Sequence, residues 1–118
     1  MKVILLSTVL HPIDFDNVIR SGMSLNPSHQ HYYVSLIKAL SPQHDVAVYS
    51  LFPRTRVPNI MKSKRGFQKA TFYYAQPTAS FILRWWRYRR LVLTALQSIK
   101  EPFIVIVDRA SRLLLNLA

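Results

Sequence analysis

Hydrophobic residues follow two patterns along this chain, unbroken runs and helical stripes. Four runs of aliphatic, β-branched and aromatic residues stand at residues 2–9, 45–51, 71–75 and 103–107. Such runs are typical of strands that are buried on both faces of a parallel sheet. We therefore predict four strands, the last of which is ended by Asp108.

Two longer stretches repeat apolar residues at the spacing of an α-helix. The first begins at Asn26, which can cap a helix, has Pro27 at its first helical position and stops before Pro42. The second is predicted over residues 80–100, with Thr78 as an alternative start. Its expected inner face comprises Phe81, Trp85, Tyr88, Val92, Ala95, Leu96 and Ile99.

The order of these elements defines a fold class. Strand, helix and strand over residues 2–51 form a βαβ unit, which predicts an α/β domain with a parallel, Rossmann-like sheet and flanking helices. Segments 10–25 and 52–69 lack both patterns and are predicted to be loops. Because a further helix begins at 113–117 and is not completed, we expect residues 1–118 to be a partial domain with an exposed apolar edge.

The composition narrows the possible functions. Lysine and arginine number 16 against 5 acidic residues, a net charge of +11, which favours nucleic acid, phosphorylated ligands or anionic lipid as partners. The 2 glycines are too few for a GxGxxG or Walker loop, and the absence of cysteine excludes disulfides and thiolate zinc sites. No apolar run approaches the ~18 residues of a membrane span, and we interpret the N-terminal run as a strand rather than a signal peptide.

One series of segments resembles a known family. The first strand is followed by Ser21-Gly22, by Asn26–Gln30 and Leu36–Leu40 in the first helix, and by Asp45–Ser50 in the next strand. This series resembles the N-terminal Rossmann-like domain of bacterial GT-B fold glycosyltransferases, in particular the retaining type (glycosyltransferase family 4-like). Its most specific part is Gly22–Ala39.

The resemblance implies an enzyme of two α/β domains that moves a sugar from a nucleotide-sugar donor to an acceptor in the cleft between them, in cell-envelope or polysaccharide synthesis. The N-terminal domain would hold the acceptor, and a C-terminal domain with a pair of acidic residues would bind the nucleotide-sugar. Because that second domain is absent from residues 1–118, we expect the chain to be a fragment that is inactive alone. No metal or cofactor is called for, and we expect a cytoplasmic protein that is peripheral at the inner membrane face.

The loop before the first helix is the main candidate for substrate binding. In α/β sheets, ligands lie beyond the carboxyl ends of the strands, where helix N-termini offer free N–H groups to a phosphate or a sugar hydroxyl. The candidate residues are Ser21, Gly22, Ser24 and Asn26. The alternative is that they form only a turn and a helix cap.

Several other polar residues have weaker claims to chemistry. His29 and His31 are two positions apart, so they point to different faces of the helix and do not suit a shared metal ion. His11, near the end of the first strand, is a candidate for substrate contact, although we expect it to be an ordinary surface histidine. Asp108 is a candidate general base, although such an aspartate more often caps the helix that follows it.

The second helix carries a basic side with an aromatic neighbour, formed by Arg84, Trp86, Arg87 and Arg90. Arginine beside exposed tryptophan suits an anionic membrane surface, and also a nucleic-acid backbone with base stacking. The third possibility is that this side is an ordinary solvated helix face, on which Trp86 is covered by the missing part of the domain. An alternative function is therefore a small basic protein that binds nucleic acid or anionic membranes, with nucleic acid less favoured because no known binding motif occurs.

Overall fold

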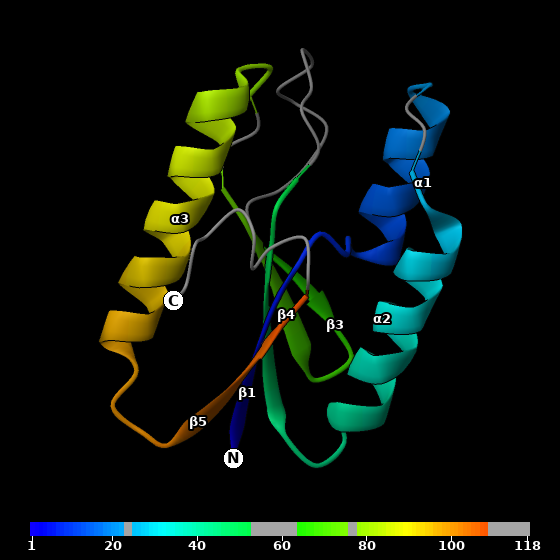
Figure 1. Cartoon of the computed structure of the whole chain (residues 1–118). Coiled ribbons are helices and arrows are strands. Elements are labelled where there is room, and N and C mark those ends of the chain that lie inside the picture. Colours follow the sequence, from blue (N-terminus) through cyan, green and yellow to red (C-terminus); the bar gives the residue numbers. More distant parts are fainter. Residues whose placement is uncertain (23–24, 53–63, 76–77, 109–118) are drawn as a thin grey trace.

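The computed structural model describes residues 1–22, 25–52, 64–75 and 78–108. Within these residues the chain forms three helices and five strands (Figure 1). In chain order they are β1 (Lys2–Ser7), α1 (Pro12–Arg20), α2 (Pro27–Leu40), β2 (Asp45–Ser50), β3 (Lys64–Phe67), β4 (Ala70–Tyr74), α3 (Phe81–Ser98) and β5 (Phe103–Val107).

The strands form one mostly parallel sheet. Their order is β3-β4-β2-β1-β5, with β1, β2, β4 and β5 parallel and β3 antiparallel to β4. The α/β fold class and the four predicted strands are therefore confirmed. The helix predicted at 113–117 lies outside the described residues.

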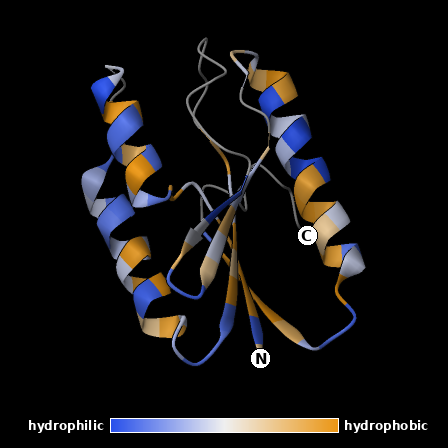
Figure 2. Cartoon of the chain, turned by 180° about the vertical axis from the view of Figure 1, so that it is seen from behind, coloured by the Kyte–Doolittle hydropathy of each residue, from blue (hydrophilic) through white to orange (hydrophobic). Residues whose placement is uncertain are grey.

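Helices cover both faces of the sheet, with α1 and α2 on one side and α3 on the other (Figure 1). Side chains alternate between the faces along each strand, so Val3 and Leu5 pack under α1 and α2, whereas Ile4 and Leu6 pack under α3. The helix α3 contributes Tyr88 and Val92 to its side of the core, and both are completely buried. Figure 2 shows the apolar strand segments enclosed between these two helical layers.

The prediction of a loop over residues 10–25 was wrong, because α1 occupies most of it. His11 caps this helix with its Nδ1, which accepts from the N–H of Ile13, and Pro12 is the first helical residue. The helical stripe was hidden because its inner face contains Asp14, which is fully buried beside Val18. From the sequence alone an aspartate is expected at the surface, because its burial depends on partners that the local pattern does not show.

The prediction of a loop over 52–69 was wrong at its end, where β3 adds an antiparallel edge strand. Residues 64–67 alternate between exposed and half-buried positions, and Gln68 at φ +54° lies in the turn to β4. Lysine and arginine suit an edge strand because charged side chains discourage pairing with another chain. The same charges made the segment look like a loop.

Two apolar segments are more exposed than their patterns predict. Phe81, placed on the inner face of its helix by the sequence, is 57% exposed. In β5, which pairs with β1 in the described residues, Phe103, Ile104 and Val105 are all exposed. The unbroken apolar run of β5 therefore predicted the strand correctly, but it did not predict the exposure of these side chains.

Candidate functional site at the carboxyl edge of the sheet

The strand order places a topological switch point between β1 and β5. From β1 the chain adds β2 and then β4 on one side, and it returns to add β5 on the other side of β1. In open α/β sheets, ligands bind in the crevice outside the carboxyl ends of the strands at such a point. Ser7 ends β1 and Asp108 directly follows β5, so both lie at this place.

Four polar side chains meet there, and we call them the carboxyl-edge cluster: Ser7, His29, Tyr33 and Asp108. The hydroxyl of Ser7 donates to Oδ2 of Asp108 at 3.0 Å, and His29 Nε2 lies 2.6 Å from the same oxygen. The side chain of Asp108 is 7% exposed and that of His29 is 29% exposed. A short contact between a carboxylate and an imidazole in so sheltered a place is a strong, charge-assisted hydrogen bond.

The start of α2 positions His29 for this contact. Asn26 Oδ1 accepts from the backbone N–H groups of Ser28 and His29, at 3.0 and 3.2 Å, which confirms the predicted cap. His29 therefore sits in the first turn, where the partial positive charge of the helix favours a nearby carboxylate such as that of Asp108.

Tyr33 stands one turn further along α2, and its ring centroid is 4.8 Å from that of His29. Burial raises the pKa of the Tyr33 hydroxyl, and the negative charge of Asp108 raises it further. The tyrosine therefore stays neutral and keeps a hydroxyl beside the pair. Local patterns do not single out Tyr33 or Ser7. The pairing of β1 with β5 brings Ser7 to Asp108, and the position of α2 on the sheet brings Tyr33 there.

The cluster has the parts needed to move a proton. When Asp108 is ionised, it accepts from His29 Nε2, which must then carry the proton, and in the neutral ring Nδ1 keeps a lone pair. A carboxylate that orients an imidazole in this way prepares it to take a proton from a hydroxyl. The cap that we predicted for Asp108 involves residues outside the described ones.

A second polar cluster lies near the start of α1, and its side chains are hydrogen-bonded to one another. Asp14, fully buried, accepts from Arg65 Nε at 2.8 Å and from the Tyr74 hydroxyl at 2.9 Å. The Tyr74 hydroxyl in turn accepts from the backbone N–H of His11 at 2.8 Å. These contacts fasten α1 to β3 and β4, so we assign them a structural role.

His11 is buried, with 7% exposure, so its prediction as a surface residue was wrong. Its Nε2 lies 3.0 Å from the carbonyl oxygen of Gly66, while Nδ1 caps α1. Both ring nitrogens therefore contact backbone groups, and the ring packs against Phe67 and Phe72.

Of the residues predicted to bind substrate, the three that the structure describes lie at helix ends. Ser21 is the C-cap of α1, and its hydroxyl donates to the carbonyl of Val18 at 2.6 Å. Gly22 has φ +94°, a left-handed conformation that glycine adopts easily after a helix. Ser24 lies outside the described residues, and Asn26 caps α2. Their role in binding stays a prediction.

The arginines on the basic side of α3 differ in exposure and in their contacts within the chain. Arg84 Nε donates to the carbonyl of Phe52 at 2.6 Å, which ties this arginine to the end of β2. Arg90 is exposed and its guanidinium lies 5.8 Å from the ring centre of Trp86, which is 53% exposed. Arg87 is half-buried on the same side.

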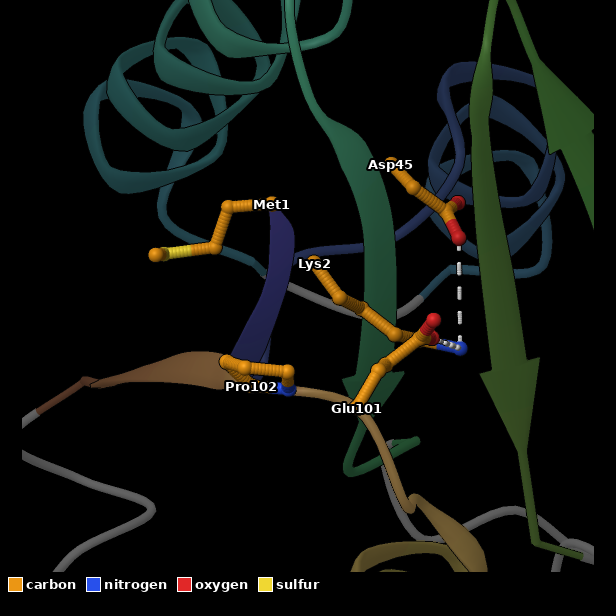
Figure 3. Close-up of a pocket in the computed structure, with 5 residues that line it drawn as sticks. All are labelled: Met1, Lys2, Asp45, Glu101 and Pro102. Carbon is orange, nitrogen blue, oxygen red and sulfur yellow. Dashed lines mark ion pairs between the residues drawn. The ribbon is translucent and has the colours of Figure 1, made fainter.

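A hollow of about 400 Å³ lies at the opposite, amino edge of the sheet (Figure 3). Lys2 Nζ lies 3.9 Å from Asp45 and 4.0 Å from Glu101, and the two carboxylate side chains are 70% and 63% exposed. Solvated ion pairs of this kind add little to stability. Their edge is also the wrong one for a ligand of a parallel sheet.

No three His, Asp or Glu side chains in the part of the chain that the structure describes come together as a metal site would require. No described helix has the length and hydropathy needed to cross a bilayer.

The raised pKa of Tyr74 predicts sensitivity to alkali. Burial, as the largest cause, raises this pKa far above its ordinary 10.0, so the folded protein keeps the phenol neutral while the unfolded chain ionises it. The free energy of unfolding should therefore be unaffected below pH ~10 and fall above it, by about 1.4 kcal/mol per pH unit for this group. Denaturant titrations across that pH range measure the slope.

The variant Tyr74→Phe should be less stable at neutral pH, because it loses two hydrogen bonds, yet should show a shallower alkaline slope. Tyr32, a residue that is 64% exposed, provides the control Tyr32→Phe. Equal slopes in the two variants would contradict the assignment.

Comparison with protein-family models, with curated proteins and with solved structures finds no match to this chain.

Proposed function

We propose that this chain is the N-terminal, acceptor-side domain of a GT-B type glycosyltransferase. The observation that carries the proposal is the pair of His29 and Asp108 at the switch point of the sheet, where His29 Nε2 lies 2.6 Å from Asp108 Oδ2. The sequence resemblance over Gly22–Ala39 supports the same class, and His29 lies within that segment.

Sugar transfer to an alcohol forms a glycosidic bond and releases a nucleoside diphosphate and the proton of the acceptor hydroxyl. Nδ1 of His29 is suited to take that proton, and Asp108 would stabilise the imidazolium that results. The leaving diphosphate would be stabilised by preorganised donors on the second domain. In this scheme the first domain supplies the acceptor site and the proton acceptor, and the second supplies the donor site.

Sequencing the coding DNA beyond codon 118 tests this proposal. A reading frame that continues into a second α/β domain of about 100–200 residues, with a pair of acidic residues, would support it. A stop codon followed by unrelated sequence would overturn it, because the 118 residues would then have to act alone.

A second candidate function is supported by the charge of +11 and by the arginines and tryptophan on α3. In this case the chain is a small basic protein whose partner is an anionic surface rather than a sugar acceptor. Whether an anionic lipid bilayer or nucleic acid suits this side of α3 better depends on the exposed apolar residues around these arginines.

A further inference from the structure

The first turns of α3 expose an apolar tip. Ile82 is 76% exposed, Phe81 57%, Trp86 53% and Leu83 38%. Such a run of large exposed side chains costs free energy in water unless something covers it, and patches of this kind mark interaction sites. The solvent side of α3 further along is more polar, with Thr94 and Gln97 exposed.

The tip lies at the same end of the molecule as the carboxyl-edge cluster. The helix α3 follows β4 and returns to the start of β5, so its first turn lies at the carboxyl end of the parallel strands. In Figure 1 this end of α3 rises above the ends of β1 and β5. A surface that covered the tip would therefore face the same side as Asp108 and His29.

Positive charge surrounds the tip. The helix α3 contains Arg84, Arg87, Arg89 and Arg90 and no acidic residue. A surface hollow of about 440 Å³ beside the tip is lined by Leu83, Trp86, Arg87 and Arg90, among others. Arginine contacts phosphate groups well, and each basic residue close to an anionic bilayer adds measurably to binding.

The aliphatic part of the tip favours lipid over nucleic acid. Bases stack on aromatic rings and arginine planes, and phosphates are contacted by charged or polar groups. Ile82 and Leu83 provide neither kind of contact. They match acyl chains, whereas a tryptophan beside an arginine suits the headgroup region of a bilayer.

We propose that the N-terminal tip of α3 docks this domain on anionic lipid bilayers, with Ile82 and Leu83 entering the acyl boundary, Trp86 at headgroup depth, and Arg90 on lipid phosphates. The inference does not depend on sugar transfer. If both proposals hold, the carboxyl edge of the sheet faces the membrane, and the acceptor would be a lipid-linked or membrane-bound hydroxyl compound.

Vesicle binding of the full 118-residue chain tests the docking surface. We expect sedimentation with phosphatidylcholine vesicles that contain phosphatidylglycerol, weaker binding to pure phosphatidylcholine, and loss of binding as salt is raised. Ile82→Ser should weaken binding by about tenfold or more, since it removes a side chain that becomes buried in the bilayer. Arg90→Gln should reduce the preference for anionic lipid.

Ile13→Ser is the matched control, because Ile13 is 53% exposed on α1 and lies away from the tip. Equal binding by the Ile82 and Ile13 variants would overturn the proposal. So would binding of an RNA or DNA oligonucleotide that Ile82→Ser leaves unchanged, together with no vesicle binding, because the basic face would then serve nucleic acid. Neither result would bear on the His29–Asp108 pair, which vesicle binding does not require.

Discussion

Replacing Asp14 by alanine is expected to lower the free energy of unfolding by about 3–5 kcal/mol, as breaking a buried ion pair typically does. The carboxylate is fully buried and accepts from Arg65 and from the Tyr74 hydroxyl. Its removal leaves a half-buried guanidinium and a buried phenol without their partner. It also removes the contacts that hold α1 to Arg65 of β3 and to Tyr74 of β4.

Chemical denaturation measures the effect, with Asp16→Ala as the control. Asp16 lies on the same helix and is exposed, so its loss should change stability by less than about 0.5 kcal/mol. If the Asp14→Ala chain does not fold, Asp14→Asn provides the second measurement. It keeps an acceptor for Tyr74 but lacks the charge that faces Arg65, and its stability should fall between the other two. Similar stabilities for all the variants would show that the cluster does not hold α1 in place.

The strands and long helices of this fold could be predicted because their signals are local. An unbroken apolar run identifies a strand whatever its neighbours are. Asn26 followed by Pro27 marks the start of α2, and the backbone groups that Asn26 caps are at most three residues away. Burial could not be predicted in the same way. Ile104 looks as apolar as Ile4, yet it is 50% exposed because β5 lies at the edge of the described sheet.

Elements that combine polar residues with burial were the ones missed. The helix α1 turns Asp14 inward, and β3 carries Lys64 and Arg65 on an edge strand. In both, the polar side chain is satisfied by a partner far along the sequence, as with Asp14 and Arg65, which are 51 positions apart. The periodicity of hydrophobic residues gives no information about a partner so far along the sequence.

The edge of the sheet at which the candidate site lies could be predicted, but the side chains that meet there could not. Parallel topology points to the carboxyl edge, and sequence reasoning put Ser21, Gly22, Ser24 and Asn26 there. The pairing of His29 with Asp108 spans 79 positions and depends on β5 returning beside β1, which no local pattern reveals. Asp108 was singled out for its place after a strand, and its partner only became visible with the sheet order.

In the two-domain enzyme proposed above, Asp108→Asn is expected to lower the rate of sugar transfer by about 10²–10⁴, the usual contribution of a positioned acid or base. Asparagine keeps the size of the side chain and an acceptor for Ser7, but it lacks the charge that stabilises a protonated His29. His29→Asn should cause a similar loss. The double variant should be little worse than either single one, because the two residues act as a unit.

Steady-state kinetics should place the loss in kcat rather than in KM for the donor, because the nucleotide-sugar is held by the other domain. His31→Asn is the matched control, since His31 lies two residues from His29 on α2 and is exposed. Unfolding curves of the 118-residue variants show whether the fold is kept. If Asp108→Asn folds and transfers sugar as fast as the His31 variant, the cluster is structural and the proton acceptor lies elsewhere. If only the His29 and Asp108 variants lose activity, the site at the switch point carries the chemistry, with His29 as the catalytic residue and Asp108 as the residue that positions it.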